Sequence, residues 1–256
     1  MCIRVHSWFL LCFGCGLARA ECIWVCVGIV RLGRAGEHLR HGHLQIGRGP
    51  VFFNRFHFLD PGPLIDGELE LVVPCARLAD ELLAASSHPL TCLQAPADAQ
   101  VTREQIHRFL TMAPGGHESA ARFTRRLPQY HFWMKLREAY RARPGSPPLS
   151  ILGGISLRIG ATRSLELYYG HMGYHVYPAA RGRHYAERAC RLLLPLARRH
   201  GIKTLWITCN PENLASRRTC ERLGARLIEI VAIPEDEPLH ARGDRAKCRY
   251  RMSLGD

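Results

Sequence analysis

The strongest hydrophobic pattern in the chain is a single apolar stripe with the spacing of a helix. Its members recur at the i, i+3, i+4 and i+7 positions that share one helix face. They are Ala186, Ala189, Cys190, Leu193, Leu194 and Ala197. Arginines fill many of the positions between them, and Gly201 follows as a C-terminal cap. Pro195 lies inside this pattern, so we expect a bend or one unpaired carbonyl in the helix.

Two further helices are indicated by their start signals, and one by its period alone. Thr102 and Gln105 form a capping box that opens one of them. Asn210 predicts the N-cap of another, because Pro211 follows at the first helical position. The segment 76–85 has apolar residues on one face and completes the set of predicted helices.

Shorter segments with alternating or continuous apolar residues predict strands. Gly153 and Gly154 fall inside one of these and mark a bulge or a close approach of another backbone. The predicted strands are 68–73, 130–136, 150–159, 165–176, 204–209, 225–233 and 247–254. Antiparallel strands in the middle and strand–helix–strand units at the end predict an α/β fold, with a mixed sheet of about seven strands and flanking helices.

The N-terminal part lacks such a sustained pattern. An apolar run at 8–13 and a small-x-small site at 18–20 are ingredients of a signal peptide. Arg19 interrupts the apolar run, so no transmembrane helix is expected. We expect residues 1–65 to be an extension that is disordered or results from a mis-assigned start, with a signal peptide or a functional segment as alternatives. The folded domain then spans 66–256.

Composition narrows the class of protein without naming it. The 256 residues carry a net charge of +13 and 11 cysteines, and the apolar fraction of 47% excludes global disorder. Six cysteines are scattered as in a reduced protein, which favours the cytoplasm unless residues 1–20 are a true signal peptide. The basic charge suits a polyanion, but no nucleic-acid-binding motif, paired zinc ligands or metal site is evident. Almost all of the positive charge is arginine, the lysines being Lys135, Lys203 and Lys247.

The candidate chemistry lies where a strand ending at Pro178 leads into the long helix. Free backbone N–H groups at a helix N-terminus attract anions, and the helix dipole adds partial positive charge. Arg181 and Arg183 add full charges that bind phosphate oxygens bidentately. The spacing differs from both the Walker pattern and GxGxxG. We therefore expect a phosphate-bearing ligand of another kind at this turn.

The same residues resemble the GNAT superfamily of N-acetyltransferases. Val176-Tyr177-Pro178 is similar to the Val-x-Pro strand end of this family. The six residues 181–186 occupy the places of its Gln/Arg-x-x-Gly-x-Gly/Ala phosphate loop. Arg181 and Ala186 match that pattern, whereas His184 stands where the central glycine is usual. Glycine permits close approach of the backbone to pyrophosphate and either sign of φ, so this position departs from the family in a physically meaningful way.

A second segment strengthens the resemblance. Residues 213–225 are similar to the Asn-x-x-Ala/Ser…Glu-Lys-x-Gly-Phe segment, especially in the group that includes ribosomal-protein N-terminal acetyltransferases. In that family the asparagine, here Asn213, contacts the pantetheine arm of the cofactor. Many members have a tyrosine seven residues later as the acid for the leaving thiolate. That place is held by Cys220, so the tyrosine's role does not carry over.

The resemblance implies a splayed mixed sheet and acetyl-CoA as co-substrate, without a metal. The acetyl group would move to an amine acceptor, a small molecule or a protein, by direct attack in a ternary complex, and a backbone N–H near Val176 would polarise the thioester carbonyl. His171, His175 and Glu166 are candidate bases, although each histidine could instead be structural. The predicted cofactor-binding residues are Val176, Arg181, Gly182, Arg183, His184, Tyr185, Ala186, Asn210, Asn213 and Ser216.

Three classes of function therefore remain open. The first is an acetyl-CoA-dependent N-acetyltransferase, which both motifs favour. The second is a catalytically degenerate acyl-CoA sensor or interaction module, because His184 and Cys220 depart from the family pattern. The third is a nucleic-acid binder, for which the net charge is the only support. We expect neither a nucleic acid nor a membrane as partner, and the sequence leaves the oligomeric state open, a dimer being one alternative.

Overall fold

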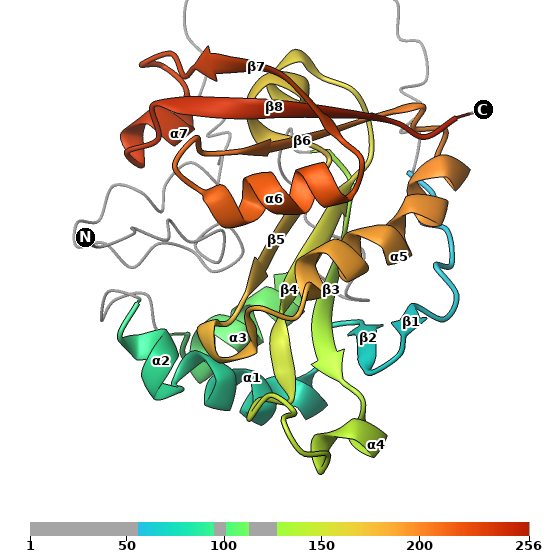
Figure 1. The fold of residues 1–256 in the computed structure, drawn as a ribbon, viewed down its shortest axis with the longest axis vertical. Coiled ribbons are helices and arrows are strands. Elements are labelled where there is room, and N and C mark those ends of the chain that lie inside the picture. The colour runs from blue at the N-terminus through green and yellow to red at the C-terminus, as the bar shows by residue number, and fades with distance from the viewer. Residues whose placement is uncertain (1–55, 95–100, 113–126, 256) are drawn as a thin grey trace, which may run out of the picture.

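The computed structural model describes residues 56–94, 101–112 and 127–255, which form two antiparallel sheets with helices packed on them (Figure 1). The first sheet has the order β1-β2-β3-β4-β5 and the second the order β6-β8-β7. The strands are β1 (Ile65–Asp66), β2 (Leu69–Val72), β3 (Gln129–Leu136), β4 (Ile151–Arg158), β5 (Met172–Val176), β6 (Thr204–Cys209), β7 (Arg226–Ala232) and β8 (Ala246–Ser253). The predicted α/β class is confirmed, with the two-residue β1 as an added strand.

The predicted helices are present, together with three short ones. Thr102 and Gln105 form the expected capping box: the Thr102 N–H donates to Gln105 Oε1 at 2.8 Å, and the Gln105 N–H donates to Thr102 Oγ1 at 3.2 Å. The helices are α1 (Ala79–Ser86), α2 (Pro89–Cys92), α3 (Arg103–Met112), α4 (Glu138–Arg141), α5 (Tyr185–Arg199), α6 (Leu214–Arg222) and α7 (Pro238–Ala241). Two 3-10 turns, η2 (Ala76–Leu78) and η5 (Pro178–Ala180), precede α1 and follow β5.

Helix α5 is the apolar stripe predicted from the sequence. The helix packs against β2, β4 and β5 and lies over β4 in Figure 1. Pro195 is exposed, and α5 continues through it to Arg199. The stripe therefore faces the core as its spacing predicts, with Ala186 half-buried and its other five members buried.

One predicted strand is wrong over its first half. The sequence predicts one strand over 165–176, but Leu165–Tyr169 form a π-helical turn, η4, and β5 begins only at Met172. Gly170 separates the two with φ 65°, and a Cβ there would lie 2.9 Å from the Thr208 N of β6. Thr208 Oγ1 donates to the Tyr168 carbonyl at 2.8 Å. Contacts with β6 thus hold a turn that the local alternation of apolar residues does not reveal.

The two glycines of β4 confirm the expected close approach. A Cβ on Gly153 would lie 2.1 Å from the His175 carbonyl oxygen, and one on Gly154 would lie 2.7 Å from His175 Cε1. The β3–β4 register also shifts between Met134 and Lys135, as a bulge requires. These glycines let β5 and the ring of His175 lie closely against β4.

The segment before β1 packs on the same core. Phe56 stacks on His200 with ring centroids 5.4 Å apart, and the Leu59 N–H donates to the hydroxyl of Tyr130 at 2.6 Å. The boundary predicted at residue 66 therefore falls inside β1, and the packed region already includes 56–64. Residues 1–55, on which the signal-peptide alternative rests, lie outside the described part. Within the described residues, no helix has the length and apolar character needed to span a membrane.

Candidate active site

The two sheets meet at β5 and β6, the facing edge strands. At the start of β5, the His171 N–H donates to the Trp206 carbonyl at 2.7 Å. The Trp206 N–H donates in return to Nδ1 of the His171 ring at 3.0 Å. No strand ladder joins β5 to β6 anywhere in the described part of the chain. The two strands diverge beyond these two hydrogen bonds, as Figure 1 shows, so the sheet is splayed as expected.

The register of β5 shows which backbone groups face the divergence. Tyr177 N–H donates to the Leu152 carbonyl at 2.8 Å, which makes these two residues a hydrogen-bonded pair across β4 and β5. Such pairs alternate with non-hydrogen-bonded ones in antiparallel ladders. Val176, paired with Gly153, is therefore non-hydrogen-bonded, and its N–H and C=O point away from β4. We call this side of residues 172–176 the open edge of β5.

The turn after β5 presents the N-terminus of α5. Gly182 has φ 82° and His184 has φ 58°, so two left-handed residues reverse the chain before Tyr185 starts the helix. The side chain of the N-cap His184 makes no capping hydrogen bond. The first-turn N–H groups of α5 therefore lack a side-chain cap and are available to an anion.

Three arginines surround this turn. Arg181 Nε donates to the Val176 carbonyl at 3.1 Å and its Nη1 to Gln94 Oε1 at 2.6 Å, while burial lowers its pKa. Arg183 donates to the Gly145 carbonyl. From the far end of α6, Arg222 donates to Nδ1 of His184 at 3.0 Å. Sequence reasoning missed Arg222, which lies 38 residues from His184 and meets it only through the packing of α6 beside α5.

The second motif residues gather at the start of α6. Asn213 is the N-cap of this helix, and its Oδ1 accepts the Ser216 N–H at 3.1 Å. The Tyr174 hydroxyl, from β5, lies 3.0 Å from Ser216 Oγ and 3.8 Å from Cys220 Sγ. Burial holds the pKa of Tyr174 well above its usual range. The structure thus brings Asn213 and Ser216 together with Tyr174 of β5.

The predicted N-cap at Asn210 is wrong, because this side chain is used elsewhere. Its Nδ2 donates to Asp244 Oδ1 at 2.6 Å, and its Oδ1 accepts a hydrogen bond from Lys247 Nζ. Lys247 Nζ also donates to Asp244 Oδ2 at 2.9 Å, and the lysine is only 2% exposed. This buried group ties the end of β6 to the loop before β8 and delays the start of α6 to Leu214.

The three predicted catalytic residues lie on different parts of the chain from η4 to the end of β5. His171 is 3% exposed, its Nδ1 accepts the Trp206 N–H, and burial lowers its pKa. Five residues of extended chain, roughly 16 Å, separate it from Val176. Glu166 is half-buried on η4, before β5 begins, and its carbonyl accepts the Arg249 Nε–H at 2.9 Å. His175 adjoins Val176 in sequence, and burial lowers its pKa to about 3.

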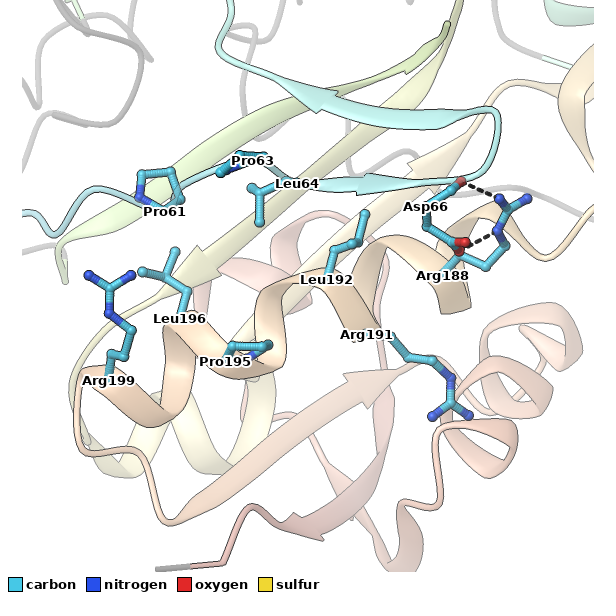
Figure 2. Close-up of a pocket in the computed structure, with 10 residues that line it drawn as sticks. All are labelled: Pro61, Pro63, Leu64, Asp66, Arg188, Arg191, Leu192, Pro195, Leu196 and Arg199. Carbon is cyan, nitrogen blue, oxygen red and sulfur yellow. Dashed lines mark hydrogen bonds and ion pairs between the residues drawn. The ribbon is translucent and has the colours of Figure 1, made fainter. Parts of the chain in front are cut away.

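A separate cavity of about 410 Å³ lies between α5 and the segment leading into β1 (Figure 2). Its walls include Leu64, Leu192 and Leu196, and Arg188 at one end bonds to Asp66. None of the residues predicted for the active site lines it. Within the described residues, no group of His, Cys, Asp or Glu side chains is arranged to hold a metal ion.

Comparison with known proteins agrees with this geometry. The family model described as "Acetyltransferase (GNAT) domain" matches residues 71–226. The chain therefore belongs to the GNAT family of acetyltransferases. It is an acetyl-CoA-dependent N-acetyltransferase, with acetyl-CoA as co-substrate and an amine as acceptor. No curated protein matches the chain significantly.

Solved structures share the fold at low sequence identity. The microcin C7 self-immunity acetyltransferase MccE, solved with acetyl-CoA and AMP, is 17% identical with a TM-score of 0.53, over 73% of this chain and 93% of that one. The ribosomal L7/L12 α-N-protein acetyltransferase RimL, solved with CoA, is 15% identical with a TM-score of 0.52, over 75% and 97%. A GNAT acetyltransferase from Bacillus anthracis is 15% identical with a TM-score of 0.51, over 75% and 98%.

Proposed function

We propose that acetyl-CoA binds with its pyrophosphate at the turn 181–184 and its pantetheine arm along the open edge of β5. The observation that carries this proposal is the direction of the Val176 backbone, whose N–H faces away from β4 beside the α5 N-terminus. The Tyr185 and Ala186 N–H groups would then meet phosphate oxygens, with Arg181, Gly182, Arg183 and His184 forming the turn around them.

The thioester carbonyl is polarised at the same edge. An unpaired N–H at Val176 supplies a preorganised donor for the oxyanion that forms when the amine attacks. Asn213 and Ser216, at the start of α6, are proposed to contact the pantetheine amides, whereas Asn210 acts indirectly by fixing the loop before them. Direct attack in a ternary complex needs no covalent intermediate on the enzyme, so proximity supplies much of the rate acceleration.

The acceptor is proposed to be an amine that has an appreciable deprotonated fraction near neutral pH. His171 lies at the other end of β5 from Val176, Glu166 lies on η4 before that strand, and burial makes His175 a weak base. Since none of the described residues places a strong base beside the thioester, an α-amino group, of pKa about 8, is a better nucleophile than a lysine side chain, of pKa about 10.4. A protein or peptide N-terminus fits this requirement, and RimL is an α-N-protein acetyltransferase. A small-molecule amine of similar pKa is the second candidate acceptor.

We place this reaction in the cytoplasm. The six cysteines in the described part of the chain are all free, as is usual in a reducing compartment. Four of them are buried and act as small apolar residues between the second sheet and the helices α5 and α6.

The test is acetyl transfer by the purified chain to matched peptides. One peptide offers a free N-terminus and no lysine, and its partner offers one lysine behind a blocked N-terminus. Mass spectrometry should find acetylation of the first peptide with one CoA released per acetyl group, and a much lower kcat/KM for the second at pH 7.5. Tight CoA binding without transfer to either peptide or to a panel of small amines would contradict the proposal.

A further inference from the structure

Tyr174 reaches from one sheet to the helix that covers the other. It lies on β5, the last strand of the five-stranded sheet, and its hydroxyl contacts α6, which follows β6 of the second sheet. The hydroxyl lies 3.0 Å from Ser216 Oγ, 3.4 Å from the Ser216 carbonyl and 3.8 Å from Cys220 Sγ. Three contacts with one helix fix the position of this phenol on the far side of the open edge.

The backbone of Tyr174 belongs to the same open edge as Val176. It pairs with Ile155 two positions before the Val176–Gly153 pair, so both residues are non-hydrogen-bonded and present their N–H groups away from β4. A donor chain lying along this edge at Val176 would pass the Tyr174 side chain where it crosses to α6. The phenol is therefore placed beside the reacting end of an acyl donor bound as proposed above.

Aminolysis of a thioester creates a need for a proton at this place. The C–N bond forms as the amine attacks, and the C–S bond breaks to release a thiolate, whose conjugate thiol has a pKa of about 8.5. Protonation of that sulfur in the transition state accelerates its departure. The amine nitrogen loses one proton to solvent during the reaction, and a donor that protonates the sulfur regains a proton from solvent afterwards, so the reaction remains balanced.

The groups around the phenol suit a donor better than an acceptor of protons. Its neighbours are the Ser216 hydroxyl and the thiols of Cys220 and Cys190. Burial among them raises the pKa of Tyr174, which keeps the phenol protonated at neutral pH. Cys220 is fully buried, and a hydrogen bond to Cys209 together with burial raises its own pKa. The hydroxyl of Tyr174 therefore retains its proton under working conditions.

We propose that Tyr174 donates the proton taken up by the departing thiolate of CoA, with Ser216 and Cys220 holding its hydroxyl in position. This assignment rests on the proposed placement of acetyl-CoA along the open edge of β5. It adds a catalytic residue from β5 to the candidate residues predicted from the sequence.

The test compares Tyr174→Phe with the native chain on two acetyl donors. With acetyl-CoA, the variant should lose about 100-fold in kcat, the low end of general-acid effects, while KM for acetyl-CoA stays within about threefold. With S-phenyl thioacetate, whose aryl thiolate departs without protonation, the kcat/KM values of variant and native chain should agree within about threefold. Equal losses with both donors would assign Tyr174 a structural role and overturn the proposal, as would an unchanged kcat with acetyl-CoA.

Tyr169→Phe is the matched control, since Tyr169 lies on η4 and donates to Glu237 Oε2 at 3.3 Å, away from α6. It should retain native kcat with acetyl-CoA. Calorimetry with CoA distinguishes the proposed cofactor site from the proposed role of Tyr174. If the native chain binds no CoA, the proposed function is contradicted. If both chains bind CoA equally, a difference in kcat between them reports on the role of Tyr174 alone.

Discussion

The two ends of strand β5 meet β6 in different ways. At its start, the backbone and ring of His171 exchange hydrogen bonds with Trp206, so the polar groups of both strands are satisfied by protein. Near its end, the Val176 N–H faces away from β4, and no strand pairs with it in the described part of the chain. The closed end of β5, at His171, holds the two sheets together. The open end, at Val176, leaves backbone N–H donors for a ligand.

This difference explains why a single strand can support both stability and chemistry. Buried backbone groups without partners are costly, so a protein keeps them only where a ligand or solvent can satisfy them. The hydrogen bonds between His171 and Trp206 hold the sheets together at one end, so β5 and β6 separate only in the part of β5 beside the α5 N-terminus. We therefore expect changes at the closed end to affect folding and changes at the open end to affect turnover.

The largest expected effect comes from Gly170→Val at the closed end. The new side chain would clash with the β6 backbone 2.9 Å away and would also occupy a left-handed conformation, at φ 65°. Overpacking and backbone strain together should lower the free energy of unfolding by about 3 kcal/mol or more. Urea unfolding followed by circular dichroism measures this loss.

Gly201→Ala is the matched control for that change. Gly201 has a similar φ of 74°, but a Cβ there meets nothing within 4 Å. Strain without a clash should cost only about 1 kcal/mol. Equal losses for the two variants would show that the β5–β6 contact at Gly170 contributes nothing beyond local backbone conformation.

Val176→Pro tests the open end of β5, where we expect an effect on turnover and little effect on stability. Proline removes the N–H that is proposed to bind the oxyanion, and this N–H takes no part in the β4–β5 ladder. Losing one oxyanion donor should lower kcat by about 100-fold or more, with little change in the free energy of unfolding. His175→Pro, which removes a ladder N–H one residue earlier, should instead unfold the edge of the sheet. Retention of native kcat by Val176→Pro would contradict the proposed role of Val176.

Acid should destabilise both ends of β5, because burial holds a histidine neutral at each: His171 at the closed end and His175 beside Val176 at the open end. Burial lowers the folded-state pKa of His171, and that of His175 to about 3, whereas an unfolded histidine has a pKa of about 6.5. The unfolded chain therefore binds more protons below pH 6.5, and stability is present above that pH and lost as pH falls towards 3. For His175 the loss at pH 5 should be about 2 kcal/mol.

Chemical denaturation at pH 7 and pH 5 measures this loss, and His175→Asn should reduce the difference between the two pH values. An unfolding free energy that stays constant from pH 7 to pH 5 would mean that neither ring is held neutral by burial.

Elements whose pattern is long and local were predictable from the sequence. Helix α5 follows from its apolar stripe because the same residues that define the period also form the buried face. The η4 turn was not predictable, since Leu165 and Leu167 alternate as a strand would. Its shape depends on distant partners, such as the Thr208 hydroxyl on the Tyr168 carbonyl.

The site divides in the same way. The turn 181–184 was found from residue types, because glycine and arginine before a helix have a local physical meaning. The wrong N-cap at Asn210 shows the limit of that approach. Its side chain is captured by Asp244 and Lys247, more than thirty residues away, so Asn213 caps the helix instead. The contact of Tyr174 with α6 has the same origin in tertiary packing.

The smallest expected effect concerns His184, where the turn departs from the family pattern. Among the described residues it is the one non-glycine with positive φ, at 58°. His184→Gly should relieve left-handed strain and raise the free energy of unfolding by about 0.5–1 kcal/mol. It should also tighten CoA binding several-fold, because the backbone can approach the pyrophosphate more closely. Gly182→Ala, at φ 82°, is the opposite change and should lower stability by about 1 kcal/mol. Calorimetry with CoA decides between two uses of the turn: weaker binding by His184→Gly would mean that the imidazole contacts the ligand, and the open end would then bind phosphate through a side chain as well as through its backbone.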